Sequence, residues 1–279
     1  MSSFRGAPPQ DSTVERLLDL AEDALDIGDA HSAFELCQQA LQLAPEHAGA
    51  TFLSAESLRD LGKLFEAENA YRRVVHLTPD HSASWSALAT VLFDQLRLTE
   101  ATNCALRAIR LDPGNPEAYY ARAMIRERNN DGRGARRDYL RAGRLDPIQY
   151  PPPQVLDDAV VEAVVEEALL ALHPSIRSYL ENVAILLEDV PPEDLCSQYQ
   201  PPAPPGEILG YFAGVSLRDR SIENPWSTLP SAIVLFRKNL ERIAWDRERM
   251  IDELRVTVFH EVGHFLGLDE AELEARGLD

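Results

Sequence analysis

Prolines spaced 34 residues apart constrain the first half of the chain more than any other feature. They stand in the dipeptides Ala44-Pro45, Thr78-Pro79, Asp112-Pro113 and Asp146-Pro147. Aligning on them gives four blocks, residues 14–47, 48–81, 82–115 and 116–149. Proline cannot extend the hydrogen-bond ladder of a helix, so each is expected to follow the second of two helices in its block. The break between the two helices is expected near Gly28, Gly62, Leu96 and Asn130.

Three columns of the alignment hold the same residue type in all four blocks. One alanine column holds Ala21, Ala55, Ala89 and Ala123, a second holds Ala33, Ala67, Ala101 and Ala135, and a leucine column holds Leu43, Leu77, Leu111 and Leu145. Small residues at fixed positions let paired helices approach closely. The period and the columns together resemble the tetratricopeptide repeat. Departures are Thr51 and Ser54 in the second block and Arg122 in the fourth, where large apolar residues are usual.

That resemblance implies an all-α solenoid of four repeats with a concave face that binds peptides or partner proteins. The alternative is that the repeats only scaffold the following domain, because a fold alone does not establish a function. The fourth block carries eight arginines and five acidic residues. These arginines are expected to form a solvated helix face, or else a basic end that docks an acidic peptide or the acidic second domain.

The charge and the cysteines limit the class of protein. The net charge is −19, and residues from Val155 onward hold 24 acidic against 10 basic residues. Phosphate binding needs clustered lysine and arginine, so no nucleic acid partner is expected. No apolar run is long enough to cross a membrane, and residues 1–13 lack a signal-type apolar run and are expected to be a disordered lead-in. Three widely spaced cysteines favour a reducing, cytoplasmic location.

A second domain follows a stiff connector. Residues 150–154 contain three consecutive prolines and are expected to be a linker, with the second domain covering residues 155–279. We expect a helix over 156–172, strands over 183–187, 208–217 and 231–236, and helices from about 239 onward. The proline-dense segment 191–205 is expected to be a surface insertion or one wall of a cleft. This order predicts an α+β fold.

Residues 252–266 of this domain predict a helix that carries two histidines on one face. The sequence His-Glu-Val-Gly-His runs from His260 to His264, and Gly267 is suited to end the helix. His260 and His264 lie one turn apart, so their rings can converge on one ion. Glu253 and Thr257 extend this polar stripe. An apolar face for packing is expected from Val256, Phe259, Gly263 and Leu266.

A catalytic zinc site needs three protein ligands and one open position. After Gly267 the chain can turn back beneath the metal, which makes the carboxylate of Glu270 the expected third ligand and Asp269 the fallback. Glu261 follows the first histidine and projects beside the metal. It is expected to take a proton from water and pass it to the leaving amine.

The segment from His260 to Glu270 resembles the extended zincin metallopeptidase signature, with an acid where metzincins carry a third histidine. Residues 155–279 as a whole are similar to the small bacterial zincin-like, or minimal metalloprotease-like, domain, through segments 182–185, 209–217 and 233–240. The resemblance implies a zinc-dependent peptidase fold. In such folds an edge strand pairs with extended substrate, and Ser231–Phe236 is the candidate here, its alternative being a plain core strand.

Two hypotheses from different classes follow. The first is a cytoplasmic zinc metallopeptidase whose repeats recruit a peptide or protein substrate. The second is a non-enzymatic adaptor that carries an inactive or structural zincin-like domain, and hydrolysis of a non-peptide amide is a smaller third possibility. Tyr211 and Arg255 are conceivable stabilisers of a tetrahedral oxyanion. The other five histidines are expected to be surface or packing residues.

Overall fold

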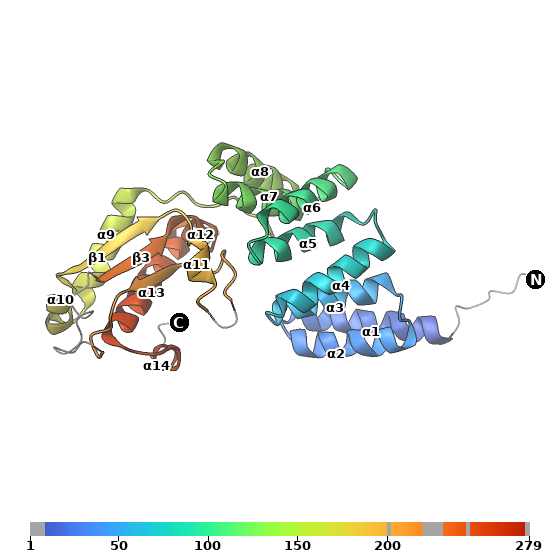
Figure 1. Ribbon diagram of the computed structural model, residues 1–279, viewed down its shortest axis with the longest axis horizontal. Coiled ribbons are helices and arrows are strands. Elements are labelled where there is room, and N and C mark those ends of the chain that lie inside the picture. Colours follow the sequence, from blue (N-terminus) through green and yellow to red (C-terminus); the bar gives the residue numbers. More distant parts are fainter. Residues whose placement is uncertain (1–8, 200–201, 220–230, 244–245, 277–279) are drawn as a thin grey trace, which may run out of the picture. The chain divides into compact units, whose positions relative to one another are not determined.

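The computed structural model describes residues 9–199, 202–219, 231–243 and 246–276 (Figure 1). The chain divides into two compact units between Tyr150 and Pro151. No helix within the described ranges is long and apolar enough to cross a lipid bilayer. The first helix begins at Pro9, so residues 9–13, expected to belong to the lead-in, are helical. Residues 1–8 of that expected lead-in lie outside the described residues.

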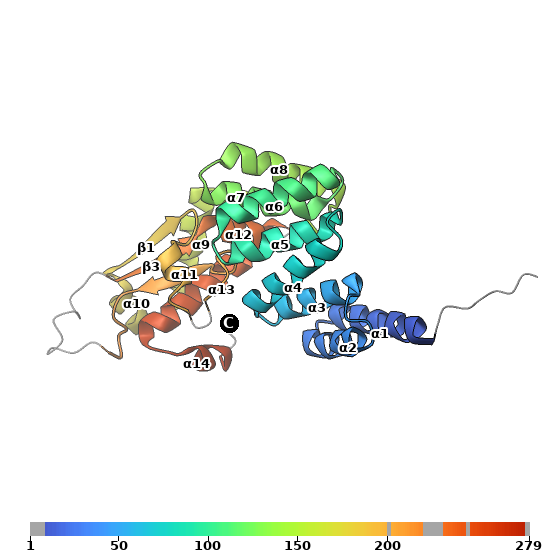
Figure 2. The same cartoon turned by 45° about the vertical axis from the view of Figure 1, so that its right-hand side comes forward.

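Helices α1 to α8 make up the described part of the first unit and stack as successive hairpins (Figures 1 and 2). Their bounds are α1 Pro9–Asp26, α2 Ala30–Leu43, α3 Ala48–Asp60, α4 Leu64–Leu77, α5 Ser82–Asp94, α6 Leu98–Leu111, α7 Pro116–Arg128 and α8 Gly132–Leu145. The two helices of each hairpin pack together, and each hairpin packs on the one that follows. The alanines of both columns are almost fully buried, with exposures of 0 to 2%. Because each alanine lacks a long side chain, the two helices of a hairpin can lie close together.

The turn inside each hairpin has the same backbone form in all four repeats. Its key residue has a positive φ, +79° at Gly28, +71° at Gly62, +59° at Leu96 and +58° at Asn130. In the first turn the N–H of Gly28 bonds the carbonyl of Leu25, and the other three turns repeat this bond. A left-handed residue ends a helix by satisfying its last carbonyls, and glycine adopts this conformation without steric cost. The two later repeats therefore hold Leu96 and Asn130 in a conformation that glycine would adopt more readily.

Two departures from the repeat pattern have local structural reasons. Arg122 of α7 donates two 2.7 Å hydrogen bonds to Asp138 of α8, and Arg126 donates a third at 2.8 Å. Asp138 is 4% exposed, so these arginines neutralise a buried carboxylate within one hairpin. The Thr51 hydroxyl donates to the carbonyl of His47. Part of the arginine excess in the fourth block is thus used inside the repeat.

The second unit is a three-stranded mixed sheet with helices. Its elements are α9 Asp158–Ala171, α10 Pro174–Leu180, β1 Val183–Glu188, α11 Glu193–Cys196, β2 Gly210–Ala213, β3 Ser231–Phe236, α12 Arg237–Ile243, α13 Arg247–Leu266 and α14 Glu270–Glu274. The strand order is β1-β3-β2, with β1 parallel and β2 antiparallel to β3. Helical repeats followed by this small α+β unit confirm the predicted fold class.

One face of the sheet carries the core of the second unit. Ile233 and Leu235 of β3 are fully buried, and the register places Ile185 and Leu187 of β1 beside them. Phe212 of β2 pairs with Ile233 on the same face and packs edge-on against Phe265 of α13. Helices α9 and α13 cover this face and pack on each other. The sheet and α9 together hold α13 in place.

The structure corrects the choice of edge strand. Ser231–Phe236 lies between the other two strands, so both its edges are paired and it cannot add a substrate strand. The edge strands of the described sheet are β1 and β2. Strand β2 is also shorter than the expected 208–217, because Gly214 has a φ of +144° and packs closely against Ser231. Helix α10 was not expected, since Pro174 was interpreted as the end of the preceding helix and instead begins the next one.

Candidate metal centre

Helix α13 carries the His-Glu-Val-Gly-His sequence in its last two turns. It begins five residues before the expected start, because the Asp246 carboxylate accepts a hydrogen bond from the N–H of Arg249 and caps the helix. Its packing face is made by Leu254, Val258, Val262 and Phe265, which are 0 to 2% exposed. The face of α13 that packs in the core is therefore rotated about the helix axis, by part of a turn, from the face that the sequence predicted. Val256, expected to pack, is 36% exposed and lines a cleft.

Glycines at the end of α13 bring the chain back beneath the histidines. Gly267 has a φ of +93° and caps the helix, and a Cβ there would lie 2.5 Å from Cβ of Arg218. Gly263 faces the returning segment, where a Cβ would overlap the side chain of Leu273 in α14. Leu273 is fully buried against this bare stretch of α13. Helix α14 is thereby fixed, and Glu270 stands at its first position.

Three side chains converge at this point. Nε2 of His260 and Nε2 of His264 are 3.1 Å apart. Oε1 of Glu270 lies 3.4 Å from Nε2 of His264, and Oε2 lies 3.6 Å from Nε2 of His260. In a tetrahedral zinc site with bonds of about 2.0–2.2 Å, neighbouring ligand atoms stand roughly 3.3–3.5 Å apart. The observed separations fit one zinc ion, and the donor set of two imidazoles and one carboxylate suits that metal.

The neighbours of His264 prepare it to be a ligand. Its Nδ1 lies 3.1 Å from the carbonyl oxygen of Leu268. A carbonyl can only accept, so Nδ1 carries the proton and Nε2 presents its lone pair toward Glu270 and His260. Such a bond to the ring's second nitrogen is the usual way in which metal-ligating histidines are oriented. Leu268 follows Gly267, so the same bend that brings Glu270 back also fixes this ring.

Asp269 does not join the group. Its carboxylate accepts a 2.9 Å bond from the N–H of Glu272, and the Glu272 carboxylate accepts one of 3.1 Å from the N–H of Asp269. This reciprocal capping box starts α14. Among the described residues, His260, His264 and Glu270 are the group of three whose ligand atoms lie within 4.8 Å of one another.

Glu261 lies beside the three ligand atoms and is 4% exposed. Its Oε2 is buried and has no hydrogen-bond partner among the described residues. Burial, together with the negative charge of Glu270, raises the pKa of Glu261 to about 8, and a bond from the backbone of Phe212 opposes the shift. A buried carboxylate with a free oxygen at the edge of a cleft needs a polar partner that enters from the cleft.

The cleft in front of these residues has a volume of about 590 Å³. Strand β2 forms one wall, and it can approach α13 because a Cβ at Gly210 would lie 2.9 Å from Cγ2 of Thr257 and 3.3 Å from Cγ of Glu261. The polar stripe of α13 forms the floor, through Glu253, Thr257, His260, Glu261 and His264. The expected continuation of the histidine stripe toward Glu253 is present.

Further cleft residues were missed by the sequence reasoning. Tyr199 and Ala203 line the cleft, so the proline-dense segment supplies a wall and is not merely a surface insertion. Burial and the nearby charge of Glu261 raise the pKa of Tyr199. The one sequence signal for this wall is an aromatic residue among polar and proline neighbours. Glu207 and Ile243 also line the cleft, and no motif marks either.

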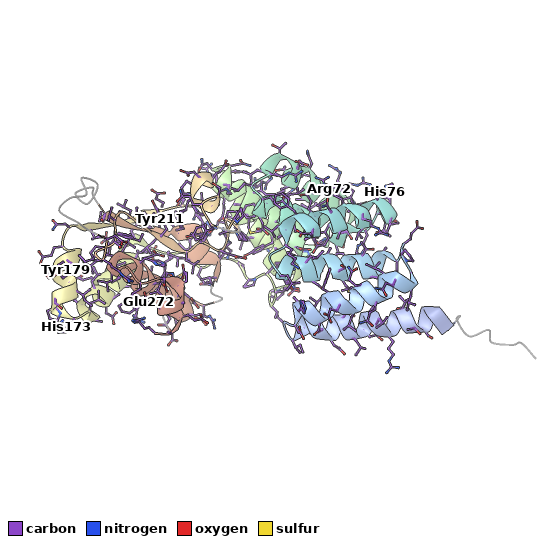
Figure 3. All side chains as sticks on the ribbon, turned by 60° about the horizontal axis from the view of Figure 1, so that its bottom comes forward. Arg72, His76, His173, Tyr179, Tyr211 and Glu272 are labelled. Atoms are coloured by element: carbon purple, nitrogen blue, oxygen red, sulfur yellow. The ribbon has the colours of Figure 1, made fainter. Side chains whose placement is uncertain are left out.

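The two conceivable oxyanion stabilisers lie in different places. Tyr211 lines the cleft from β2, and Figure 3 shows it on the sheet, with Glu272 on α14. Arg255 instead pairs with Asp252 and with Glu167 of α9, so it faces the packed helices. The other histidines have structural surroundings. His47 and His173 cap α3 and α10, while His76 lies in α4 of the repeats (Figure 3).

Fold and site together define a protein with helical repeats and a second unit in which two histidines of α13 meet a carboxylate of α14, a group that could hold a metal ion. Comparison with family models agrees with this description. Residues 24–92 and 104–136 match models of the tetratricopeptide repeat, and residues 180–278 match the model of the zincin-like metallopeptidases. The chain therefore carries tetratricopeptide repeats at its N-terminus and a zincin-like metallopeptidase domain at its C-terminus.

Solved structures also resemble parts of the chain. A crystal structure of MamA is 20% identical. The match covers 49% of this chain and 80% of the MamA chain, with a TM-score of 0.43. A mutant O-GlcNAc transferase of Thermobaculum terrenum is 21% identical. The match covers 60% of this chain and 36% of the transferase chain, with a TM-score of 0.48. Pseudomonas aeruginosa PilF is 18% identical. The match covers 62% of this chain and 73% of the PilF chain, with a TM-score of 0.46. No curated protein matches the chain.

Proposed function

We propose that the protein is a zinc-dependent metallopeptidase that hydrolyses peptide bonds in substrates recruited by its tetratricopeptide repeats. The observation that carries this proposal is the convergence of His260, His264 and Glu270 beside a buried glutamate in an open cleft. These three residues would hold the ion. A zinc ion held there supplies Lewis-acid chemistry, which lowers the pKa of water and polarises the scissile carbonyl.

Glu261 is the proposed general base and acid. It follows His260 in the helix, so its carboxylate lies beside the ligand atoms and is not one of them. The free Oε2 is placed to accept a proton from the attacking water and to return it to the leaving amine. The walls formed by β2 and Tyr199 limit the access of bulk solvent to this carboxylate. The geometry of the group supports this role independently of its pKa.

Strand β2 is the proposed docking edge for the substrate backbone. It pairs with β3 on one side only within the described sheet, and its residues from Gly210 to Phe212 line the cleft. An extended peptide added antiparallel to β2 would run past Glu261 and the histidines. Backbone pairing of this kind selects for an extended chain and not for one side chain, which suits a peptidase that acts on unfolded segments.

The repeats are the proposed recruiting element. A hairpin array presents an extended surface for peptides or proteins, and the family resemblance supports this use. Binding through the repeats would raise the effective concentration of substrate at the cleft. We place the protein in the cytoplasm, since its three cysteines are buried thiols and none of them forms a disulfide. Nothing in its charge favours a nucleic acid partner.

Peptide hydrolysis by a Glu261→Gln variant tests the proposal. Glutamine keeps the shape of the side chain but cannot accept the proton, so hydrolysis of an unfolded protein substrate is expected to fall by about 10²-fold or more. Zinc content is expected to stay at the wild-type level, because Glu261 is not a ligand. Asp252→Asn is a matched control on the same helix, since Asp252 pairs with Arg255 away from the cleft.

Each result separates the two hypotheses. Loss of hydrolysis with zinc retained supports the peptidase. Hydrolysis that persists in the Glu261→Gln variant contradicts the proposed role of Glu261. A wild-type protein that holds zinc, captures a partner through its repeats and cleaves nothing would favour the adaptor.

A further inference from the structure

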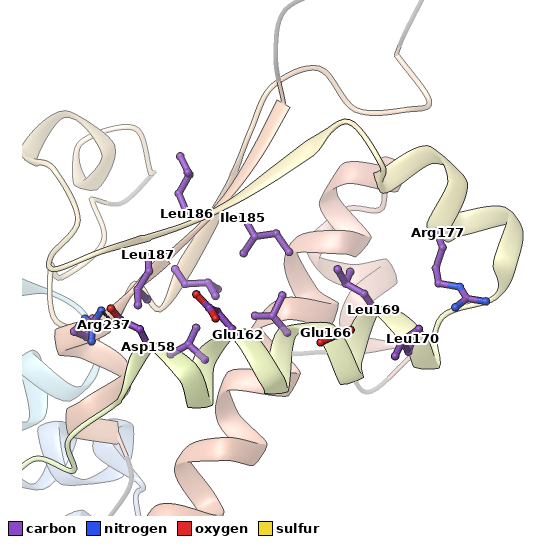
Figure 4. Close-up of a pocket in the computed structure, with 13 residues that line it drawn as sticks. Asp158, Glu162, Glu166, Leu169, Leu170, Arg177, Ile185, Leu186, Leu187 and Arg237 are labelled. Atoms are coloured by element: carbon purple, nitrogen blue, oxygen red, sulfur yellow. Dashed lines mark hydrogen bonds and ion pairs between the residues drawn. The ribbon is translucent and has the colours of Figure 1, made fainter.

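A second groove lies between helix α9 and strand β1, away from the metal centre (Figure 4). Its volume is about 570 Å³, and it shares no lining residue with the cleft. Strand β1 stands at the edge of the sheet order β1-β3-β2, so its outer edge has no strand partner among the described residues. The groove therefore combines a cavity with a row of backbone groups that can pair with another chain.

The floor of this groove is apolar. Val161, Val165 and Leu169 of α9 face Ile185 and Leu187 of β1 across it. Leu170 extends this surface at the margin, at 60% exposure, and Leu186, at 45% exposure, lies on the other face of β1 (Figure 4). Leucines left open beside an unpaired strand edge favour association with another chain.

Two unpaired carboxylates stand on the helix side of the groove. Glu162 and Glu166 line it from α9, and Figure 4 shows Glu162 directed toward β1. Neither has an ion-pair partner in the described part of the chain. Asp158, one turn earlier, is instead neutralised by Arg237 at one end of the groove. Arg177 lies at the other end, so the negative potential is concentrated in the middle.

We propose that this groove binds an extended segment of a partner protein, which adds to β1 as a further strand and carries lysine or arginine at alternate positions. Glu162 and Glu166 are one helical turn apart, a rise of about 6 Å. Residues i and i+2 of a strand are about 6.6–6.8 Å apart and point the same way. Two alternate basic side chains can therefore lay their apolar stems on the floor and reach one glutamate each.

The negative charges of Glu162 and Glu166 argue against nucleic acid, acidic peptides and a second copy of this chain as occupants of the groove. Nucleic acid and acidic peptides would be repelled by Glu162 and Glu166. A second copy of the chain would offer its own β1, whose sequence Val-Ala-Ile-Leu-Leu-Glu contains no basic residue. Pairing of two β1 edges would also bring both acidic pairs together. A basic, strand-forming segment of a different protein would pair with the free edge of β1, cover the apolar floor and neutralise both carboxylates.

A binding titration with a defined probe tests the proposal. The probe is a fluorescent, end-blocked peptide of alternating valine and lysine, six residues long to match β1, and the full-length protein is titrated while anisotropy is measured. Binding is expected to weaken by roughly tenfold in a Glu162→Gln, Glu166→Gln double variant, as two partly exposed ion pairs are lost. It is also expected to weaken as salt rises. A probe N-methylated at every residue should fail to bind, since neither of its edges can then donate backbone hydrogen bonds to β1.

Glu167→Gln is the matched control, because Glu167 lies on the same helix but pairs with Arg255 outside the groove. It is expected to bind like the wild type. Equal affinity of the double variant and the wild type would overturn the proposal, as would equal binding of a valine-glutamate peptide. Sedimentation that shows a dimer unable to take up the probe would overturn it in favour of self-association. None of these outcomes depends on peptidase activity.

Discussion

Leu273 of α14 packs onto the bare backbone of Gly263, which lies between the two histidines near the end of α13. This contact holds the returning segment against α13. It therefore places Glu270, three residues earlier, within reach of both imidazoles. The glycine of the His-Glu-Val-Gly-His sequence thus helps to bring the three candidate ligands together although it has no side chain.

Gly263→Ala is expected to weaken zinc binding while both histidines remain. The added methyl group would overlap Leu273 and push α14, with Glu270, away from the rings. Displaced supporting groups in metal sites typically cost about 10–100-fold in affinity, and we expect a loss in that range. Zinc titration against a competing chelator measures it. Gly132→Ala in α8 is the control, since its added methyl meets nothing within 4 Å, and a Gly263→Ala protein with wild-type affinity would refute the role of this contact.

Glu270→Gln and Asp269→Asn are expected to differ sharply. Removing the Glu270 carboxylate takes away one of the three proposed ligands, so zinc affinity should fall by about 100-fold or more. Asparagine caps a helix as well as aspartate does, so Asp269→Asn should keep α14 and zinc affinity unchanged. The same chelator competition measures both. Greater loss in Asp269→Asn than in Glu270→Gln would reverse the ligand assignment.

The sequence was sufficient for the periodic features. The alanine columns and the turns at Gly28, Gly62, Leu96 and Asn130 follow from the 34-residue period, because every repeat must bury the same positions. The spacing of His260 and His264 likewise follows from helix geometry. Strand order could not be obtained this way. Ser231–Phe236 is a nearly continuous apolar run, which is compatible with a buried strand but does not give its place in a sheet. Only the pairing with β1 and β2 shows that it lies in the centre.

Gly267→Ala is expected to destabilise the second unit more than Gly28→Ala destabilises the repeats. Both glycines have a positive φ, at +93° and +79°, so both substitutions cost about 1 kcal/mol in backbone strain. At Gly267 the new Cβ also meets Cβ of Arg218 at 2.5 Å, whereas at Gly28 it meets nothing within 4 Å. We expect a total of about 2–4 kcal/mol for Gly267. Thermal and urea unfolding measure both, and equal losses would show that the contact with Arg218 is unimportant.

We expect the free energy of unfolding of the repeats to depend on pH because of the carboxyl group of Glu117. Burial raises the pKa of Glu117 to about 7, against an ordinary value of 4.5, although the Ser86 hydroxyl donates a 2.6 Å hydrogen bond to it. The folded state therefore holds this proton more tightly than the unfolded state. The free energy of unfolding is then expected to fall as the pH rises from about 4.5 to about 7, by at most about 3 kcal/mol.

Urea unfolding between pH 4.5 and 8 measures this dependence. A Glu117→Gln variant should lose most of the slope, since glutamine does not ionise. Glu46→Gln, at an exposed position in the first repeat, should keep the slope of the wild type. A slope unchanged by Glu117→Gln would assign it to other groups.

The cleft walls mark the limit of the sequence reasoning at the site. Tyr199 reaches the cleft only because of how the chain between α11 and β2 folds, and no spacing rule connects it to His260. Val256 was assigned to the packing face because it is apolar. In the structure β2 stands across from it and leaves it open to the cleft. Contacts between segments far apart in the sequence decide both positions.

X-ray diffraction data collected at the zinc absorption edge from zinc-loaded crystals would test the central claim most directly. We expect one anomalous peak per chain, bonded to Nε2 of His260, Nε2 of His264 and a carboxylate oxygen of Glu270, with Glu261 outside bonding distance. A peak that lacks Glu270, or no peak at this position after loading at neutral pH, would contradict the account.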